Sequence, residues 1–210
     1  MDRYAWEIRT RAFFTQVDVH KKRVLDLGCG DGAWLRECAR RGAASCLGVE
    51  QSSKIANYYG ASTGIEILGC GAEHPQLHTP MYHHAFDVVY GITSFNFMRP
   101  AHRQQILSMC AYVLKPGGTL AILDYLPPRV PSYQQGLSYK EVWTPQQWIQ
   151  ACQKEGLACS LCCPINWIYT TIFHYFGSSW WTYWLTRGIE YLCRWWCPPK
   201  YQVLLFRKDT

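Results

Sequence analysis

The chain has 210 residues, 49% of them hydrophobic, which is enough for one domain with a sizeable core. The formal net charge of +6 is mild, and the basic residues are scattered without a long run of like charge, so no nucleic-acid partner is expected. The N-terminal residues carry charges throughout and lack an apolar core, which argues against a signal peptide and favours a cytoplasmic protein.

The first predicted elements are a helix and a strand. An amphipathic helix is expected over residues 4–17, because apolar side chains recur there at helical spacing. The stretch VLDLGCGDG follows at residues 24–32, and its apolar run over residues 24–27 predicts a short buried strand. Another helix should begin at Ala33, with its N-terminus directed at whatever binds the intervening turn.

That turn carries three glycines at alternate positions, Gly28, Gly30 and Gly32. Glycine lacks a Cβ, so the backbone can turn tightly and lie against a ligand. A second strand is predicted over residues 47–50 and ends in Glu50, 22 residues after Gly28. An acid at this place in a βαβ unit binds ribose hydroxyls. The turn lacks the GxGxxG spacing of dinucleotide sites, which favours S-adenosylmethionine over NAD.

Four motifs in the right order resemble those of the class I S-adenosylmethionine-dependent methyltransferases. They are VLDLGCGDG, GVEQSS at residues 48–53, FDVVYG at residues 86–91 and VLKPGG at residues 113–118. The resemblance implies an α/β fold with a Rossmann-like, seven-stranded mixed sheet, helices on both faces and an antiparallel last strand. It also implies methyl transfer from S-adenosylmethionine to a small, apolar or amphiphilic acceptor. The alternative is a non-catalytic binding or membrane-associated module with the same fold.

The rest of the chain fits this plan as a single domain. Further strands are expected over residues 65–68, 86–91, 119–124, 157–163 and 202–206, and further helices over residues 52–59, 101–114 and 145–155. The expected parts are an N-terminal helix in residues 1–20, a cofactor-binding core over 21–125, a loop and helix on the substrate side over 126–163, an aromatic insertion over 164–200 and a final strand over 201–208.

The resemblance also implies which residues bind the cofactor. They are expected to be Asp26, Gly28, Cys29, Gly30, Glu50, Gln51, Ala72, Glu73, Tyr90 and Gly91. The chain departs from the family pattern at Gly71, because an acid that contacts adenine is usual there. Glu73 is expected to supply that contact instead.

The acceptor side is less constrained by the sequence. The residues expected to contact the acceptor are Phe95, Asn96, Phe97, Tyr125, Trp180 and Trp181. Methyl transfer is an in-line displacement, so a base is needed only if the acceptor keeps its proton. Asp124 and His102 are the candidate bases, although Asp124 also suits a loop cap and His102 a helix start.

The segment from Gly156 to Thr186 contains no Lys, Arg, Asp or Glu and is crowded with aromatic residues. A membrane span is not favoured, because the chain must return to place its last strand in the same sheet. Three interpretations of the aromatic insertion stay open: a cap over an apolar substrate pocket, a peripheral contact with a membrane interface, or a homodimer surface.

Cysteines and histidines raise the question of a metal site. Cys159 and Cys162, followed by Cys193 and Cys197, have spacings that suit zinc. The first pair lies on a predicted strand, however, where residues three apart face opposite sides, so no metal is predicted. Of the histidines between the third and fourth strands, His83 and His84 are expected at the N-terminal edge of the sheet, away from the ligand edge.

Overall fold

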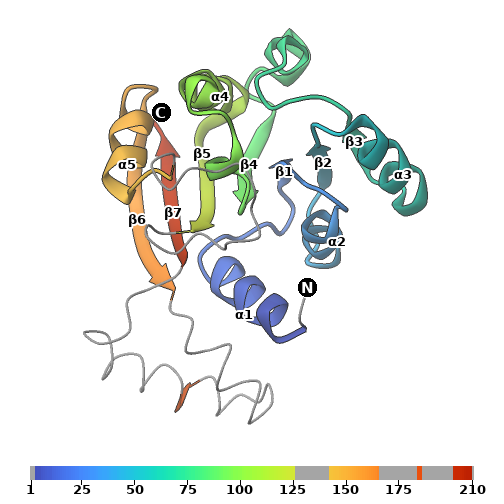
Figure 1. Cartoon of the computed structure of the whole chain (residues 1–210), viewed down its shortest axis with the longest axis horizontal. Coiled ribbons are helices and arrows are strands. Elements are labelled where there is room, and N and C mark those ends of the chain that lie inside the picture. Colours follow the sequence, from blue (N-terminus) through green and yellow to red (C-terminus); the bar gives the residue numbers. More distant parts are fainter. Residues whose placement is uncertain (1–2, 126–141, 166–183, 186–200, 210) are drawn as a thin grey trace.

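The computed structural model describes residues 3–125, 142–165, 184–185 and 201–209 (Figure 1). Its strands are β1 (Arg23–Leu27), β2 (Ser45–Val49), β3 (Glu66–Leu68), β4 (Phe86–Ile92), β5 (Leu114–Tyr125), β6 (Leu157–Ile165) and β7 (Tyr201–Lys208). Its α-helices are α1 (Arg3–Phe14), α2 (Ala33–Arg40), α3 (Ser53–Thr63), α4 (Pro100–Val113) and α5 (Pro145–Gln153).

The strands form one seven-stranded sheet in the order β3-β2-β1-β4-β5-β7-β6. Strands β1 to β5 pair in parallel, whereas β7 pairs antiparallel with both β5 and β6. The predicted mixed sheet with an antiparallel last strand is therefore confirmed. The parallel strands read as continuous apolar runs because helices cover both of their faces.

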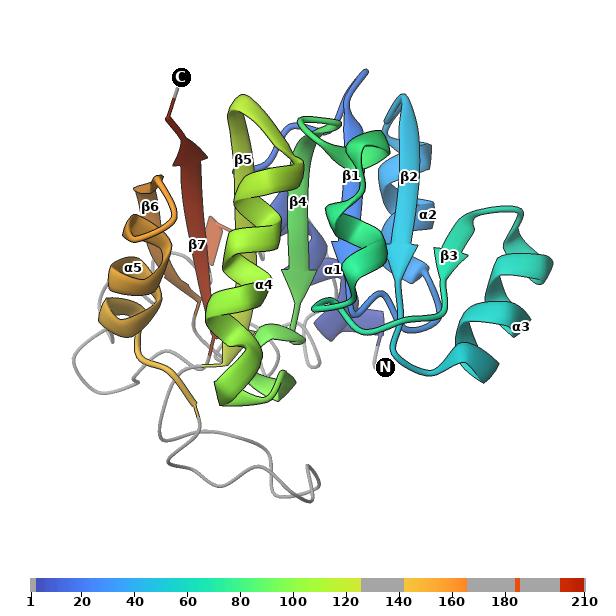
Figure 2. The same cartoon turned by 90° about the horizontal axis from the view of Figure 1, so that it is seen from above.

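Two hydrophobic cores lie on opposite faces of this sheet. Helices α4 and α5 cover one face, and α1 and α2 cover the other (Figure 2). Successive strand residues alternate between the cores: Leu25 and Val89 belong to the first, Val24 and Val88 to the second. Each large apolar side chain buried in this way contributes roughly 1.5–3 kcal/mol to stability.

Several element boundaries differ from those predicted. Helix α3 runs beyond Gly60 to Thr63 and ends at Gly64, whose φ of 69° provides the left-handed C-cap. Strand β5 begins earlier than expected, because Leu114 already pairs with Phe86 before an irregularity in the ladder. Helix α5 begins as predicted at Pro145, with Thr144 and Gln147 forming a reciprocal capping box.

No helix in the described parts of the chain has the length and hydropathy that a bilayer span requires. Most of the aromatic insertion, including Trp180 and Trp181, lies outside the described residues, as do Cys193 and Cys197. Cys159, Cys162 and Cys163 lie on β6.

Candidate functional site

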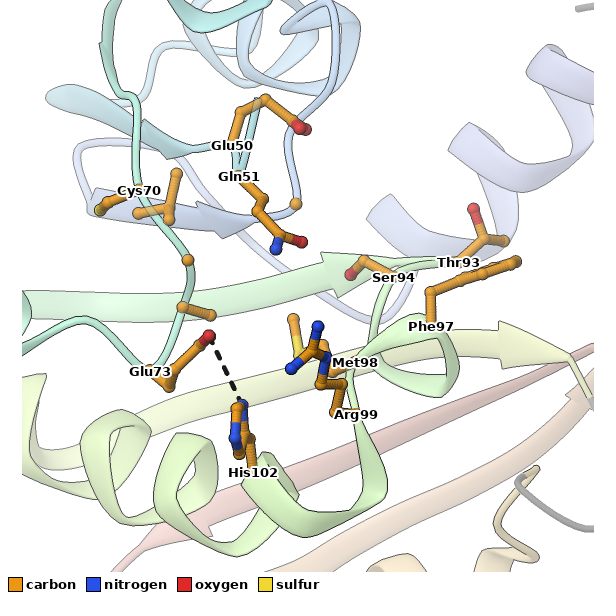
Figure 3. Close-up of a pocket in the computed structure, with 14 residues that line it drawn as sticks. Glu50, Gln51, Cys70, Glu73, Thr93, Ser94, Phe97, Met98, Arg99 and His102 are labelled. Atoms are coloured by element: carbon orange, nitrogen blue, oxygen red, sulfur yellow. Dashed lines mark ion pairs between the residues drawn. The ribbon is translucent and has the colours of Figure 1, made fainter. Parts of the chain in front are cut away.

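A pocket of about 520 Å³ opens where β1, β2, β3 and β4 end (Figure 3). It is lined by Gly28, Val49, Glu50, Gln51, Cys70, Gly71, Ala72, Glu73, Thr93, Ser94, Phe97, Met98, Arg99 and His102. Four segments that each follow a parallel strand meet here, together with the start of α4. Ligands of open α/β sheets bind at this carboxyl edge.

The glycine turn after β1 forms one side of the pocket. The backbone N–H groups of Gly28 and Cys29 both donate to the carbonyl of Val49, at 2.8 and 3.0 Å, which ties the turn to the end of β2. Gly28 has φ of 77°, and a Cβ there would lie 2.7 Å from Cβ of Ser94. Gly30 has φ of 52°, and no described atom lies within 4 Å of a Cβ built on it. Gly28 thus permits close packing, and Gly30 faces open space.

Glu50 lies beside this turn and is held by two backbone groups. Its Oε2 accepts from the N–H of Gly30 at 3.0 Å, and its Oε1 accepts from the N–H of Ser52 at 3.0 Å. The carboxylate therefore bridges the glycine turn and the start of α3. Each oxygen keeps a lone pair that can accept a hydrogen bond from a ligand hydroxyl.

Two buried polar atoms near the turn have no partner among the described residues, Asp26 Oδ1 and Ser94 Oγ. Asp26 is 2% exposed, and burial raises the pKa of its carboxyl well above the usual range, although a hydrogen bond with the Tyr90 hydroxyl lowers it. Buried polar atoms are normally satisfied, and Ser94 lines the pocket, so its unpartnered Oγ fits a ligand that carries a hydrogen-bond donor such as an ammonium group.

The opposite end of the pocket is formed by residues 70–73. A Cβ built on Gly71 would lie 2.6 Å from Oε2 and 2.8 Å from Oε1 of Glu73. The Glu73 carboxylate therefore occupies the space that a side chain at position 71 would use. Its Oε1 also lies 3.5 Å from Nδ1 of His102, drawn as a dashed line in Figure 3. An acid is thus present at this end although residue 71 is a glycine.

The structure places half of the predicted cofactor-binding residues on the wall of the pocket. Gly28, Glu50, Gln51, Ala72 and Glu73 line it. The other predicted members are Gly30, whose N–H binds Glu50, and Asp26, Cys29, Tyr90 and Gly91, which are buried. Burial also raises the pKa of the Cys29 thiol, which argues against a reactive thiolate.

The residues predicted on the acceptor side differ in their positions relative to the pocket. Phe97 and His102 line the pocket, but Phe95, Asn96, Asp124 and Tyr125 are each at most 3% exposed and do not line it. They are correspondingly unsuited to direct contact with an acceptor. The reason is local: their side chains point into the protein, where Phe95 packs edge-on against Trp148 and the polar groups bond to one another.

The pocket is also lined by residues that were not among the predicted site residues. Thr93 and Ser94 follow β4, and Met98 and Arg99 precede α4. Thr93 has φ of 52° and donates its N–H to the carbonyl of Leu123 at 2.6 Å. The feature of the sequence that could have identified Thr93 and Ser94 is their position directly after a predicted parallel strand. We refer to residues 93–98 as the 93–98 turn.

The histidines between β3 and β4 lie elsewhere. His83 and His84 stack with ring centroids 3.9 Å apart, and His83 also contacts the ring of Tyr112. Within the described parts of the chain, no three His, Cys, Asp or Glu side chains are grouped to hold a metal ion.

Comparison with curated proteins identifies methyltransferases. Residues 24–118 match a family model described as a methyltransferase domain. The chain is 34% identical over 127 residues to methyltransferase GfsG of Streptomyces halstedii, which covers 57% of this chain and 44% of that protein. It is 28% identical over 140 residues to demethylmenaquinone methyltransferase of Thermotoga maritima, which covers 65% of this chain and 59% of that protein. The chain thus spans about half the length of these curated relatives.

Comparison with solved structures shows the same fold. An S-adenosylmethionine-dependent methyltransferase from Archaeoglobus fulgidus aligns over 99% of this chain and 95% of its own, with a TM-score of 0.72 and 18% identity. The [4+2]-cyclase SpnF aligns over 98% of this chain and 80% of its own, with a TM-score of 0.66 and 18% identity. Together, the four motifs, the sheet order and the domain match over residues 24–118 show that the chain has the fold of the class I S-adenosylmethionine-dependent methyltransferases.

Proposed function

We propose that this protein transfers the methyl group of S-adenosylmethionine to a small acceptor by in-line displacement. The observation that carries the proposal is the Glu50 carboxylate, held by the N–H of Gly30 at the edge of the pocket. A [4+2]-cyclase shares the fold, so the fold alone does not identify the reaction, and the proposal rests on the pocket.

The pocket fits the three parts of this cofactor. Glu50 would accept hydrogen bonds from the ribose hydroxyls, Ser94 offers an unpartnered buried oxygen to the methionine ammonium, and Glu73 offers a carboxylate to the exocyclic amine of adenine. The volume of about 520 Å³ lies within the usual range of small-molecule sites, roughly 300–1,000 Å³.

The bound cofactor would supply an electrophilic methyl group, and the residues of this chain would orient the acceptor toward it. Asp124 is too buried to take a proton from an acceptor. His102 lines the pocket but lies at the Glu73 end, away from the glycine turn (Figure 3). These positions favour a mechanism in which alignment, rather than a dedicated base, provides most of the acceleration.

The acceptor we propose is small and at least partly apolar. Phe97 is 40% exposed at the edge of the pocket, and Met98 lines the pocket beside it. Some relatives bear the names demethylmenaquinone methyltransferase and ubiquinone biosynthesis O-methyltransferase, which are names of enzymes that act on small molecules. The alternative, a non-catalytic binding module, would keep cofactor affinity without any transfer.

The aromatic insertion, residues 164–200, is proposed to select the acceptor in a cytoplasmic protein. Peripheral contact with a membrane and a homodimer surface are the competing roles. Replacing Trp180, Trp181 and Trp184 together with Ser should leave cofactor affinity nearly unchanged while reducing acceptor methylation. Release from liposomes would instead support the membrane role, and concentration-dependent sedimentation of the wild type without lipid would support the dimer.

The proposed function is tested in two steps. Calorimetric titration with S-adenosylmethionine should show one binding site, and incubation of the protein with the methyl-labelled cofactor and cell extract should label the lipid fraction more than the aqueous fraction. Failure to bind the cofactor would refute the proposal. Binding without label transfer to either fraction would favour the non-catalytic alternative.

A further inference from the structure

The buried side chain of Asn96 joins two segments that are far apart in the sequence. Asn96 is 1% exposed, and its Nδ2 donates to the carbonyl of Tyr125 at 3.1 Å. Its Oδ1 accepts from the N–H of Trp143 at 3.2 Å. One amide group on the 93–98 turn therefore fixes both the end of β5 and the segment that enters α5.

Arg103 holds the same turn from α4. Its side chain is 1% exposed, and it donates from Nη2 to the carbonyl of Asn96 at 2.8 Å and from Nε to the carbonyl of Met98 at 3.1 Å. The guanidinium also lies 5.0 Å from the ring centroid of Trp143. Its planar fork thus binds two carbonyls at once while its face packs on an aromatic ring, which a lysine cannot reproduce.

Asp124 completes this network from β5. Its Oδ2 accepts from the N–H of Asn96 and its Oδ1 from the N–H of Tyr125, both at 2.8 Å. The Asn96 backbone is therefore bound on both sides, its N–H by a carboxylate and its carbonyl by a guanidinium. Charged partners make these bonds stronger than neutral ones.

The network does not line the pocket, but the residues that it holds do. Ser94, Phe97 and Met98 belong to the 93–98 turn and face the pocket (Figure 3). The turn is a single 3-10 turn, Phe95–Phe97, with few hydrogen bonds of its own. Its position relative to the glycine turn is therefore set largely by the groups that bind the Asn96 backbone and by the two hydrogen bonds of the Asn96 side chain.

We propose that Asn96 and Arg103 are positioning residues that hold the 93–98 turn in the conformation that binds cofactor. This inference rests on the proposed function only for the identity of the ligand. Asn96, expected from sequence to contact the acceptor, acts in this assignment through the turn. Loss of either side chain should loosen the wall formed by Ser94, Phe97 and Met98, and cofactor affinity should fall although no direct contact is removed.

The test compares the variants Arg103→Lys and Asn96→Ala with Met109→Ala. Met109 is fully buried on the same helix α4, six residues beyond Arg103, so its truncation destabilises the core without removing a side chain that binds the Asn96 backbone. Calorimetry should show S-adenosylmethionine affinity reduced roughly tenfold in the first two variants, the scale of a lost hydrogen bond, and changed less than about twofold in Met109→Ala.

Amide hydrogen exchange of the ligand-free protein supplies a measurement independent of the ligand. The N–H groups of Phe97 and Met98 donate to carbonyls within the turn and report on its opening. Their exchange should be faster by roughly tenfold in Arg103→Lys and Asn96→Ala, beyond any change in global stability, and not in Met109→Ala. If the wild-type protein failed to bind the cofactor, the proposed function would be refuted, and the exchange rates would still test the positioning role. Exchange at Phe97 and Met98 as slow as in the wild type, in both folded variants, would overturn the positioning role of Asn96 and Arg103.

Discussion

Glu50 and Gly30 lie at the ends of neighbouring strand segments and are joined by a hydrogen bond of 3.0 Å from the Gly30 N–H to Oε2 of Glu50. A second backbone group, the N–H of Ser52, donates to Oε1. The acid therefore has two tasks, since it would bind the ribose and it also holds the glycine turn against the start of α3.

Glu50→Gln should weaken S-adenosylmethionine binding by at least roughly tenfold. The glutamine amide has the same size as the carboxylate, but its NH2 group faces one of the two backbone N–H donors and cannot accept that hydrogen bond. It also removes one acceptor for the ribose hydroxyls. Isothermal titration calorimetry measures the affinity, and Glu66→Gln on β3, exposed and outside the pocket, is the control. Equal affinity of Glu50→Gln and wild type would contradict the assignment.

Gly28 and Gly30 should respond differently to substitution. Gly28→Ala places a Cβ 2.7 Å from Cβ of Ser94 at a φ of 77°, so both packing and backbone strain should lower the free energy of unfolding. Gly30→Ala meets no described atom within 4 Å, so only strain should act, roughly 1 kcal/mol. Urea denaturation should rank Gly28→Ala as the less stable.

The bulkier change Gly30→Val separates the structural from the binding role of that glycine. Its side chain would project into the open space beside Glu50, so cofactor affinity should be lost while the protein still folds. Normal binding of S-adenosylmethionine by folded Gly30→Val would mean that the turn is only structural.

An aspartate at position 71 should be able to replace the carboxylate of Glu73 at the adenine end of the pocket. Glu73→Ala removes the carboxylate next to Gly71 and should weaken cofactor binding several-fold, since a hydrogen bond from the adenine amine is lost. The double variant Gly71→Asp with Glu73→Ala restores an acid and also removes the side chain that a Cβ at position 71 would meet. Calorimetry should therefore show recovered affinity in the double variant, whereas equal affinities of wild type and Glu73→Ala would remove Glu73 from the site.

The buried carboxyl of Asp124 should make the free energy of unfolding higher at pH 5 than at pH 8. Burial raises the pKa of its carboxyl from 3.8 to about 6, although hydrogen bonds from Asn96 and Tyr125 and the charge of Arg103 oppose the shift. Between these two values the folded state binds the proton and the unfolded state does not, so stability falls as pH rises through about 6. Relative to Asp124→Asn, the free energy of unfolding of the wild type should fall by about 1–2 kcal/mol between pH 5 and pH 8.

Urea denaturation of both proteins at the two pH values measures this difference. Taking the difference cancels the pH-dependent contributions of all other groups, which both proteins share. A pH-independent difference would show that Asp124 does not titrate in this range.

The sequence predicted the parts of the site that depend on local spacing. The glycine turn and Glu50 lie within one βαβ unit, so their separation along the chain determines that they meet. The C-terminal end of α3 was predicted too early, before Gly60. Gly60 and Gly64 both suit a helix end, and only packing selects the second.

Asp124 shows why the acceptor side was harder to predict. An acid at the end of a strand can project into a pocket or be buried beneath it, and its position in the sequence does not distinguish the two. The Asp124 side chain is buried because Arg103 and Asn96, which come from other elements, surround its carboxylate. Similarly, nothing local to Ser94 indicates that its hydroxyl is buried and unpartnered beside Gly28.

The ladder between β6 and β7 pairs Ile165 with Tyr201, and Tyr201 in turn pairs with Tyr125 at the end of β5. Residues 166–200 therefore leave and rejoin the sheet at neighbouring points on its ligand edge. The entropy of closing such a connection grows only slowly with the number of residues in it. This segment can thus be shortened, lengthened or exchanged for that of another protein at little cost to the sheet, and under its proposed role in selecting the acceptor, new acceptor preferences can arise during evolution without changes to the cofactor-binding strands.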